Sequence, residues 1–216
     1  MSNSQDSILQ QACPTIMVPL YEEMPLLSRS GHRFLAAADG LWMEIKRPWL
    51  HIIWPLAQQN AVAMPYGNLK QSISFSFGCI PAEPLDQFMD DACRTLPNEF
   101  AAWIVWNSET KAFSYRPLLA KIAGPVYLNL ERSVLGEHEH LVVDIHSHGH
   151  LPAVFSKIDD MDDAGEVKLS VVIGSLGVGQ TATRKLRLCA NGITIRADIL
   201  KELTGLQIKR KDGFNS

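Results

Sequence analysis

The sequence predicts an α+β protein in which a β-rich extension precedes the main domain. Strand-like runs of apolar or alternating residues recur along most of the chain, whereas helical signals occur only over 84–96 and near 157–165. The patterned runs before residue 80 are all strand-like. We therefore expect a β-rich extension over 1–80, a main domain over 81–205 and a flexible tail over 206–216.

The extension begins without a periodic pattern. Residues 1–30 contain three prolines, so we expect loop or extended structure there. The segment 33–56 predicts three strands, with a turn at Asp39-Gly40 and a break at Pro48. Its heavy load of aromatic residues favours packing in a core over the alternative, a platform for a partner protein.

The remaining elements follow from apolar spacing. A strand is expected within 66–81, where every second residue from 73 to 77 is apolar, and a helix is expected over 84–96. The runs 100–107 and 112–118 predict a hairpin of two strands. Further strands are expected within 119–140, which also contains a charged loop, and over 167–175 and 184–190.

Composition narrows the class of protein. The chain has 216 residues and a net charge of −3, with a pI near 6.2, which argues against binding nucleic acid by charge alone. No apolar run approaches the roughly 18 residues of a membrane span, and the first residues do not resemble a signal peptide. We therefore expect a cytoplasmic protein with no nucleic-acid or membrane partner.

The cysteines show no paired spacing that would indicate a structural zinc site or a redox motif. In a reducing compartment we expect free and mostly buried thiols. The chain has four: Cys13, Cys79, Cys93 and Cys189.

The most informative stretch is HSHGHLPAVFSKIDD at 146–160. His146 and His148 follow an apolar run that predicts a strand, and side chains at i and i+2 leave the same face of a strand. Asp159 can supply a third ligand from the next element. Two histidines and a carboxylate are a common ligand set of a catalytic zinc site, so the first hypothesis is a zinc hydrolase.

Ser156 and the acidic residues after it have a structural explanation as well. Ser156 followed by Asp159 resembles a capping box that starts a helix at Lys157. A cap is compatible with the metal site, because it fixes the helix entry while the first turn presents Asp159. The acidic run from 159 to 163 lacks the spacing of a calcium loop, so negative charge at a helix N-terminus is the favoured account.

A zinc hydrolase also needs a general base, and carboxylates are common in that role. Glu99 lies where a polar turn meets the apolar run 100–107, which places it at the mouth of a predicted buried strand. A base facing a cleft and a solvated turn glutamate both remain open for this residue.

Together these residues resemble the signature of the JAB/MPN family of metalloproteases, also called JAMM proteases: an upstream glutamate, His-x-His, seven residues, Ser, two residues and Asp. The similarity spans roughly 81–205. It implies a curved sheet flanked by helices, as in cytidine deaminases, and a Zn²⁺ ion held by the two histidines and the aspartate. It also implies that Glu99 deprotonates the bound water and returns the proton to the leaving amine, while Ser156 stabilises the oxyanion.

The resemblance implies a substrate class too. Family members cleave peptide or isopeptide bonds at the C-terminus of ubiquitin or ubiquitin-like proteins, and some prokaryotic relatives process sulfur carriers or other peptides. The amino-acid sequence around the histidines further resembles that of a component of the bacterial PRTRC cassettes. Such cassettes encode a ThiF-like adenylating protein, which is therefore an expected partner beside a small ubiquitin-like substrate.

Two local features and two rival functions need weighing. Where many family members have proline after the second histidine, this chain has Gly149 and His150; we favour an exposed loop histidine over an alternate ligand or a substrate contact. His138 and His140 form a rival pair, for which a solvated loop is favoured.

A non-catalytic MPN scaffold is the alternative function. A zinc deaminase is disfavoured because the chain lacks a PCxxC motif.

Overall fold

The computed structural model describes residues 4–58, 62–124, 127–131 and 134–196. The chain divides into two compact units, Met1–Ser76 and Phe77–Ser216. The predicted tail over 206–216 lies outside the described residues. In the described part of the chain, no helix is long and apolar enough to span a membrane.

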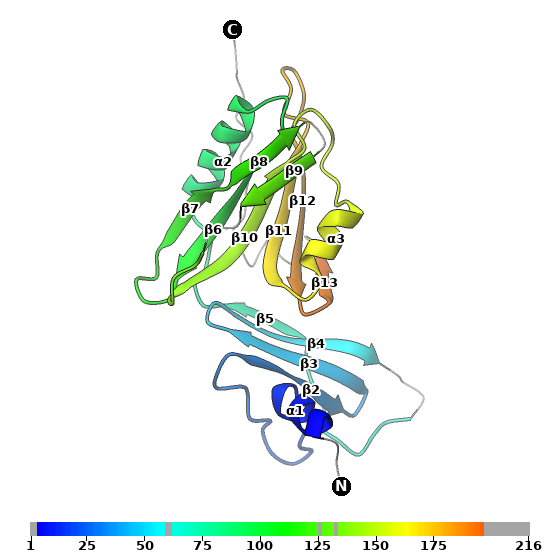
Figure 1. Cartoon of the computed structure of the whole chain (residues 1–216). Coiled ribbons are helices and arrows are strands. Elements are labelled where there is room, and N and C mark those ends of the chain that lie inside the picture. Colours follow the sequence, from blue (N-terminus) through cyan, green and yellow to red (C-terminus); the bar gives the residue numbers. More distant parts are fainter. Residues whose placement is uncertain (1–3, 59–61, 125–126, 132–133, 197–216) are drawn as a thin grey trace. The chain divides into compact units, whose positions relative to one another are not determined.

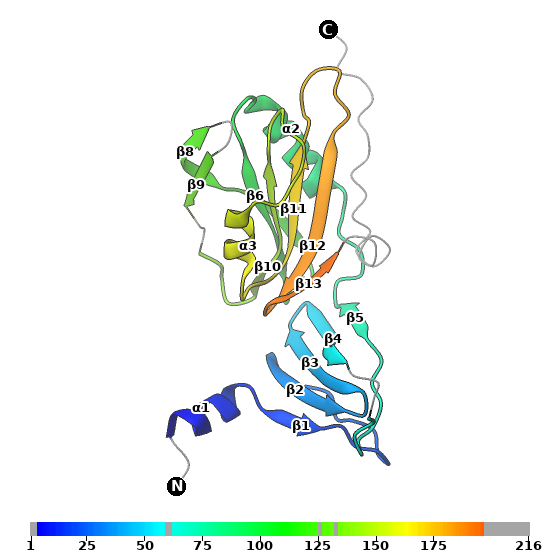
Figure 2. The same ribbon diagram turned by 90° about the vertical axis from the view of Figure 1, so that its right-hand side faces the viewer.

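The N-terminal unit contains a five-stranded sheet with the order β1-β2-β3-β4-β5 (Figures 1 and 2). Only the β1–β2 pair is parallel among these strands. The three strands expected within 33–56 are confirmed as β2, β3 and β4, and β5 confirms the strand expected within 66–81. The bounds are β1 Thr15–Met17, β2 Gly31–Ala37, β3 Gly40–Arg47, β4 Leu50–Gln58 and β5 Ser72–Phe75.

Aromatic residues of this unit pack inside, as expected. Trp42 and Trp49 are both buried, and Trp42 belongs to an apolar cluster with Leu35 and Ile53. The turn between β2 and β3 requires glycine, because a Cβ on Gly40 would lie 2.0 Å from the carbonyl oxygen of Ala57. Burial of the tryptophans favours the core role over a platform for a partner.

The expectation of loop or extended structure over 1–30 was wrong for its first part. Helix α1 (Ser4–Ala12) forms there, with Asp6 in its first turn. Its sequence is rich in good helix formers such as Gln, Leu and Ala. Because none of its residues is buried, the helix lacks the apolar face by which a sequence pattern reveals a helix.

The C-terminal unit is built on a six-stranded sheet with the order β13-β12-β11-β10-β6-β7 (Figure 1). The β10–β11 pair is parallel, and the other pairs are antiparallel. The hairpin expected from 100–107 and 112–118 is confirmed as β6–β7. The bounds are β6 Ala101–Asn107, β7 Phe113–Pro117, β10 Glu139–Ser147, β11 Val167–Gly174, β12 Thr183–Ala190 and β13 Ile193–Arg196.

Helices cover both faces of this sheet. Helix α2 (Glu83–Arg94) buries Leu85, Phe88 and Ala92 and packs on β6 and β7, which confirms the helix expected over 84–96. Helix α3 (Lys157–Asp163) packs on β11, and it lies on the side of the sheet away from α2 (Figure 2). The expected α+β architecture is therefore confirmed.

Residues 119–140 contain more regular structure than expected. Besides β9 (Tyr127–Glu131), which confirms the expected strand, β8 (Leu119–Gly124) pairs with it in a separate two-stranded sheet. The run LAKIAG has no alternating pattern, so β8 depends on its partner strand rather than on local preference.

The free thiols are less buried than expected. Among the described residues Cys189 is buried, but Cys79 is exposed and the other two cysteines are intermediate. Burial of a thiol depends on where its chain segment lies in the fold, which the spacing of the cysteines does not encode.

Candidate metal centre

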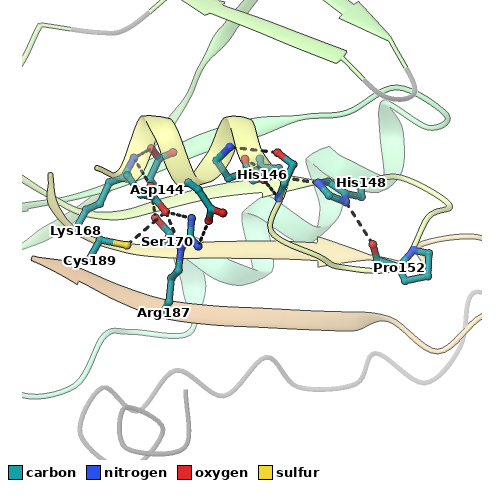
Figure 3. Close-up of polar contacts among 12 residues, drawn as sticks. Asp144, His146, His148, Pro152, Lys168, Ser170, Arg187 and Cys189 are labelled. Atoms are coloured by element: carbon teal, nitrogen blue, oxygen red, sulfur yellow. Dashed lines mark hydrogen bonds and ion pairs between the residues drawn. The ribbon is translucent and has the colours of Figure 1, made fainter. Parts of the chain in front are cut away.

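Two histidines and an aspartate converge at the end of strand β10. The Nε2 atoms of His146 and His148 lie 3.2 Å apart (Figure 3), and Asp159 Oδ1 is 3.5 Å from His146 Nε2. One ligand atom from each residue lies within 4.8 Å of the other two. The structure thus brings together the three residues that the sequence proposed as metal ligands.

The spacing of these atoms fits a zinc ion. Two ligand atoms at zinc–nitrogen distances of about 2.0–2.1 Å and a tetrahedral angle lie roughly 3.3–3.4 Å apart. The two short separations, 3.2 and 3.5 Å, are close to that value. Nitrogen and carboxylate oxygen donors also match the ligand chemistry of zinc. The donor types and these two separations therefore fit such an ion.

Strand β10 and the loop after it place the histidines. His146 pairs in register with Val172 of β11 and Ala101 of β6, while His148 lies just beyond the strand and donates its backbone N–H to the Ile173 carbonyl at 2.7 Å. The Nδ1 of His148 lies 3.3 Å from the Pro152 carbonyl oxygen. Because that oxygen only accepts, Nδ1 carries the hydrogen and the lone pair is on Nε2, which faces the site.

A capping box orients the aspartate. Ser156 Oγ accepts a hydrogen bond from the Asp159 backbone N–H at 3.2 Å, and Asp159 Oδ2 accepts one from the Ser156 N–H at 2.6 Å. One carboxylate oxygen is thereby held in the cap while the other points at the histidines. The expected cap at Ser156 and the helix start at Lys157 are confirmed. The oxyanion role of Ser156 stays a prediction, and its hydroxyl proton is not used by the cap.

The loop between the histidines and α3 is fixed to the β11–β12 turn. The backbone N–H groups of Ser175 and Leu176 donate to the carbonyls of Leu151 and Gly149, at 2.7 and 2.9 Å. A Cβ on Gly174 would lie 2.2 Å from the Leu151 carbonyl oxygen, so only glycine permits this close approach. The loop that carries His148 is therefore held against the end of β11 and the β11–β12 turn by backbone contacts.

Glu99 lies just before β6, and its position is tied to the residue between the two histidines. The backbone N–H of Phe100 donates to Ser147 Oγ at 3.0 Å, and the Ser147 N–H donates to the Phe100 carbonyl at 2.8 Å. Ser147 is fully buried. The sequence analysis missed Ser147, because the pattern of ligands gives no role to the residue between them.

The electrostatic setting of Glu99 differs from that of a solvated turn residue. Burial, and then the nearby charge of Asp159, raise its pKa to about 7. A carboxyl with a pKa near neutrality is suited to accept and release a proton. Its assignment as the general base stays a prediction.

The surroundings of the His146 imidazole favour the form of the ring that binds a cation. Burial lowers the pKa of His146, and His148 lowers it further, whereas the charge of Asp159 acts in the opposite direction. The net effect favours the neutral ring, which is the form that coordinates a metal.

The other histidines lie apart from this group. His150 is exposed, which confirms the favoured loop histidine, and the metal-like grouping among the described residues does not include it. The solvated-loop interpretation was wrong for His140: it lies in β10, and its ring packs 6.1 Å from that of Trp106. Pairing of β10 with β6 draws this polar residue into the sheet.

The expectation of negative charge at the N-terminus of a helix is confirmed for Asp159 and Asp160, which lie in the first turn of α3, but Asp163 belongs to a cluster of ion pairs beneath the helix. Asp163 is buried in the last turn of α3 and contacts Lys168, Ser170 and Arg187 (Figure 3). Lys168 also pairs with Asp144 at 2.7 Å. The account of Asp163 as a helix N-terminal charge is therefore wrong, because the helix ends at this residue and two cations compensate it.

Comparison with known proteins identifies a family for each of the two units. Residues 81–189 match a family described as prokaryotic homologs of the JAB domain, and residues 3–76 match a family described as a domain of unknown function (DUF2016). No curated protein matches the chain. A solution structure of a protein from Desulfitobacterium hafniense is similar, at 14% identity and a TM-score of 0.40, over 53% of this chain and 86% of that chain.

Proposed function

Because the chain belongs to the family of prokaryotic homologs of the JAB domain, we propose that it is a zinc-dependent peptidase or isopeptidase. The observation that carries the proposal is the convergence of two imidazoles and one carboxylate within 4.8 Å. A second carboxyl, that of Glu99, lies close enough to Asp159 for the charge of Asp159 to raise its pKa. A fold of this family alone does not imply activity, so the proposal depends on the site.

In this proposal His146, His148 and Asp159 hold the zinc ion. Zinc, when bound, lowers the pKa of a coordinated water and polarises a carbonyl group. Glu99 accepts a proton from the attacking water and returns it to the leaving nitrogen. The Ser156 hydroxyl donates to the oxygen that gains negative charge; such a donor contributes about 3–4 kcal/mol to other hydrolases.

The proposed substrate is the C-terminal segment of a small bacterial ubiquitin-like protein, in peptide or isopeptide linkage. This substrate class, and a ThiF-like adenylating protein as partner, rest on the sequence resemblance to the JAB/MPN family and to the PRTRC cassette. An extended C-terminal tail suits a site in which two proposed ligands lie at the end of a strand and all three proposed ligands are only partly buried.

Metal analysis and one substitution test the catalytic role. We expect about one zinc per chain, and cleavage of ubiquitin-like fusion proteins that mass spectrometry detects at the C-terminal junction. Glu99→Gln should keep the zinc and lower turnover by about 10²–10⁴-fold. Glu109→Gln, at an exposed position in the β6–β7 turn, is the matched control and should cleave normally.

The alternative function, a non-catalytic scaffold, predicts a different result. A scaffold would bind ubiquitin-like proteins without cleaving them, and it would contain no stoichiometric zinc after gentle purification. Full activity in Glu99→Gln would show that the base is assigned to the wrong residue. Absence of zinc in the wild-type protein would remove the peptidase proposal altogether.

A further inference from the structure

Helix α3 carries the proposed ligand Asp159, yet apolar packing does not hold it in place. Its only buried residue is Asp163, and the apolar side chains Ile158 and Met161 are 65% and 76% exposed. A seven-residue helix is too short to be stable on its own. Surface helices normally dock through an apolar face, so the position of α3 must depend on other contacts.

Those contacts converge on one arginine of strand β12. The guanidinium of Arg187 pairs with Asp163 at 2.5 Å and with Asp160 at 2.5 Å. Its central carbon also lies 3.8 Å from the centre of the Phe155 ring, in the segment that precedes the helix cap. Arg187 therefore contacts the chain before α3, its first turn and its last residue.

The planar guanidinium suits this arrangement. Its donors lie in a fixed fork that reaches two carboxylates while its face stacks on an aromatic ring. The Arg187 side chain is only 11% exposed and that of Asp163 only 8%, so water screens their attraction weakly. Lys168 adds a second cation, which lies 2.9 Å from Asp163 Oδ1, whereas Arg187 pairs with Oδ2.

We propose that Arg187 is a positioning residue for the metal ligand Asp159, because it clamps α3 at both ends against β12. The inference rests on the proposed metal site and goes beyond it, since it assigns the orientation of one ligand to a residue 28 positions later in the chain. Asp160 follows Asp159 directly, so loss of the Arg187 contact frees the turn that presents the ligand. Partners that orient a ligand commonly change metal affinity by about 10–100-fold.

The direction of the change in zinc affinity distinguishes a positioning role of Arg187 from an effect of its charge. Removal of a positive charge near a cation site should strengthen metal binding on Coulomb grounds alone. Loss of positioning should weaken it. A weaker zinc affinity in Arg187→Gln thus cannot come from the change in net charge. Lys185→Gln is the matched control, because Lys185 is exposed on the same strand and loses the same charge.

The experiment measures the zinc dissociation constant by chelator competition and the visible absorption of the Co²⁺-substituted site. We expect Arg187→Gln to bind zinc about 10-fold or more weakly, with an altered Co²⁺ spectrum. Arg187→Lys keeps the charge but not the fork and should fall between this variant and the wild type. Lys185→Gln should bind zinc at least as tightly as the wild type.

A charge-neutral variant keeps the test valid even when Arg187→Gln does not fold. Phe155→Leu removes only the stacked ring and should weaken zinc binding by about threefold. Wild-type affinity and an unchanged Co²⁺ spectrum in Arg187→Gln, or in Phe155→Leu where Arg187→Gln does not fold, would overturn the inference and leave the metal site intact. A wild-type protein that binds no metal would instead contradict the proposed function.

Discussion

The buried hydroxyl of Ser147 offers a sharp test of how the base is placed. Ser147 Oγ is the acceptor for the backbone N–H of Phe100, the residue that follows Glu99. Ser147→Ala leaves that N–H without its acceptor in a partly buried setting, and an unsatisfied donor costs about 1–3 kcal/mol. For a chain of this size each kcal/mol lowers the melting temperature by about 2–4 °C, so we expect a decrease of roughly 2–12 °C.

The same change should affect catalysis more than metal binding. The Ser147 side chain leaves the strand on the face opposite to its neighbours in sequence, His146 and His148, so the ligands keep their own supports. The segment with Glu99, in contrast, loses one of its two hydrogen bonds to β10. Misplacement of a reacting group by about 1 Å can lower turnover by about 10²-fold.

The assay compares melting temperature, zinc affinity and turnover at saturating zinc for the wild type and Ser147→Ala. Ser114→Ala is the control, because Ser114 is an exposed serine of β7, where a change should stay within about 0.5 kcal/mol. We expect zinc affinity within about threefold of the wild type and a tenfold or larger loss of turnover. Normal turnover in a destabilised protein would refute the link between Ser147 and the base.

Three further predictions concern backbone strain and pH. Gly149→Ala should destabilise the protein by at least about 1–2 kcal/mol and lower turnover, because Gly149 has φ +52° and a Cβ there would lie 2.8 Å from the Pro97 carbonyl oxygen. Gly165→Ala, at φ +80° with no atom within 4 Å of the added Cβ, should show the strain alone in thermal melts. The folded-state pKa of Glu99 is raised to about 7, so the folded state disfavours the ionised carboxylate. The metal-free protein should therefore lose stability as pH rises from about 4.3 to 7. Thermal melts of Glu99→Gln should not show this loss. Burial alone would raise the pKa of Asp163, but its cationic and hydroxyl partners lower it overall. Its contribution to the free energy of unfolding is therefore present above about pH 4 and is lost on further acidification. Denaturant titrations of Asp163→Asn should show a free energy of unfolding that depends less on acid pH.

The local geometry of the ligands was accessible to sequence reasoning. The i and i+2 histidines at the end of an apolar run, and the Ser-x-x-Asp cap, each follow from short-range rules of strands and helix ends. The structure places His146, His148 and Asp159 within coordinating reach of one another. These features depend on residues fewer than fifteen positions apart, which explains why the pattern of the chain contained them.

The supports of the site were not accessible in the same way. Arg187 reaches α3 only because β12 pairs with β11 in one particular register, and nothing near Arg187 in the sequence marks it. Ser147 and Phe100 are 47 positions apart and meet only after β10 pairs with β6. Sheet register is a tertiary property, so contacts that depend on it cannot be deduced from local preference.

The conformation of Gly149 also bears on the departure from the family pattern. Proline restricts φ to about −65°, whereas this residue has φ +52°. A proline after the second histidine is therefore incompatible with the loop path in this chain. The loop also approaches the Pro97 carbonyl so closely that a Cβ on Gly149 would lie 2.8 Å from its oxygen, so only glycine fits at this position.

Side chains of strand β10 point alternately to the two faces of the sheet, and residues on both faces contribute to the proposed site. Asp144 and His146 leave one face, where Lys168 connects Asp144 to the last residue of α3. Ser147 leaves the other face and holds the segment that precedes β6. A shift of register by one residue would exchange these faces and separate ligand, clamp and base together. The arrangement of the proposed metal ligands, the ion pairs beneath α3 and the placement of Glu99 are therefore consequences of a single strand register.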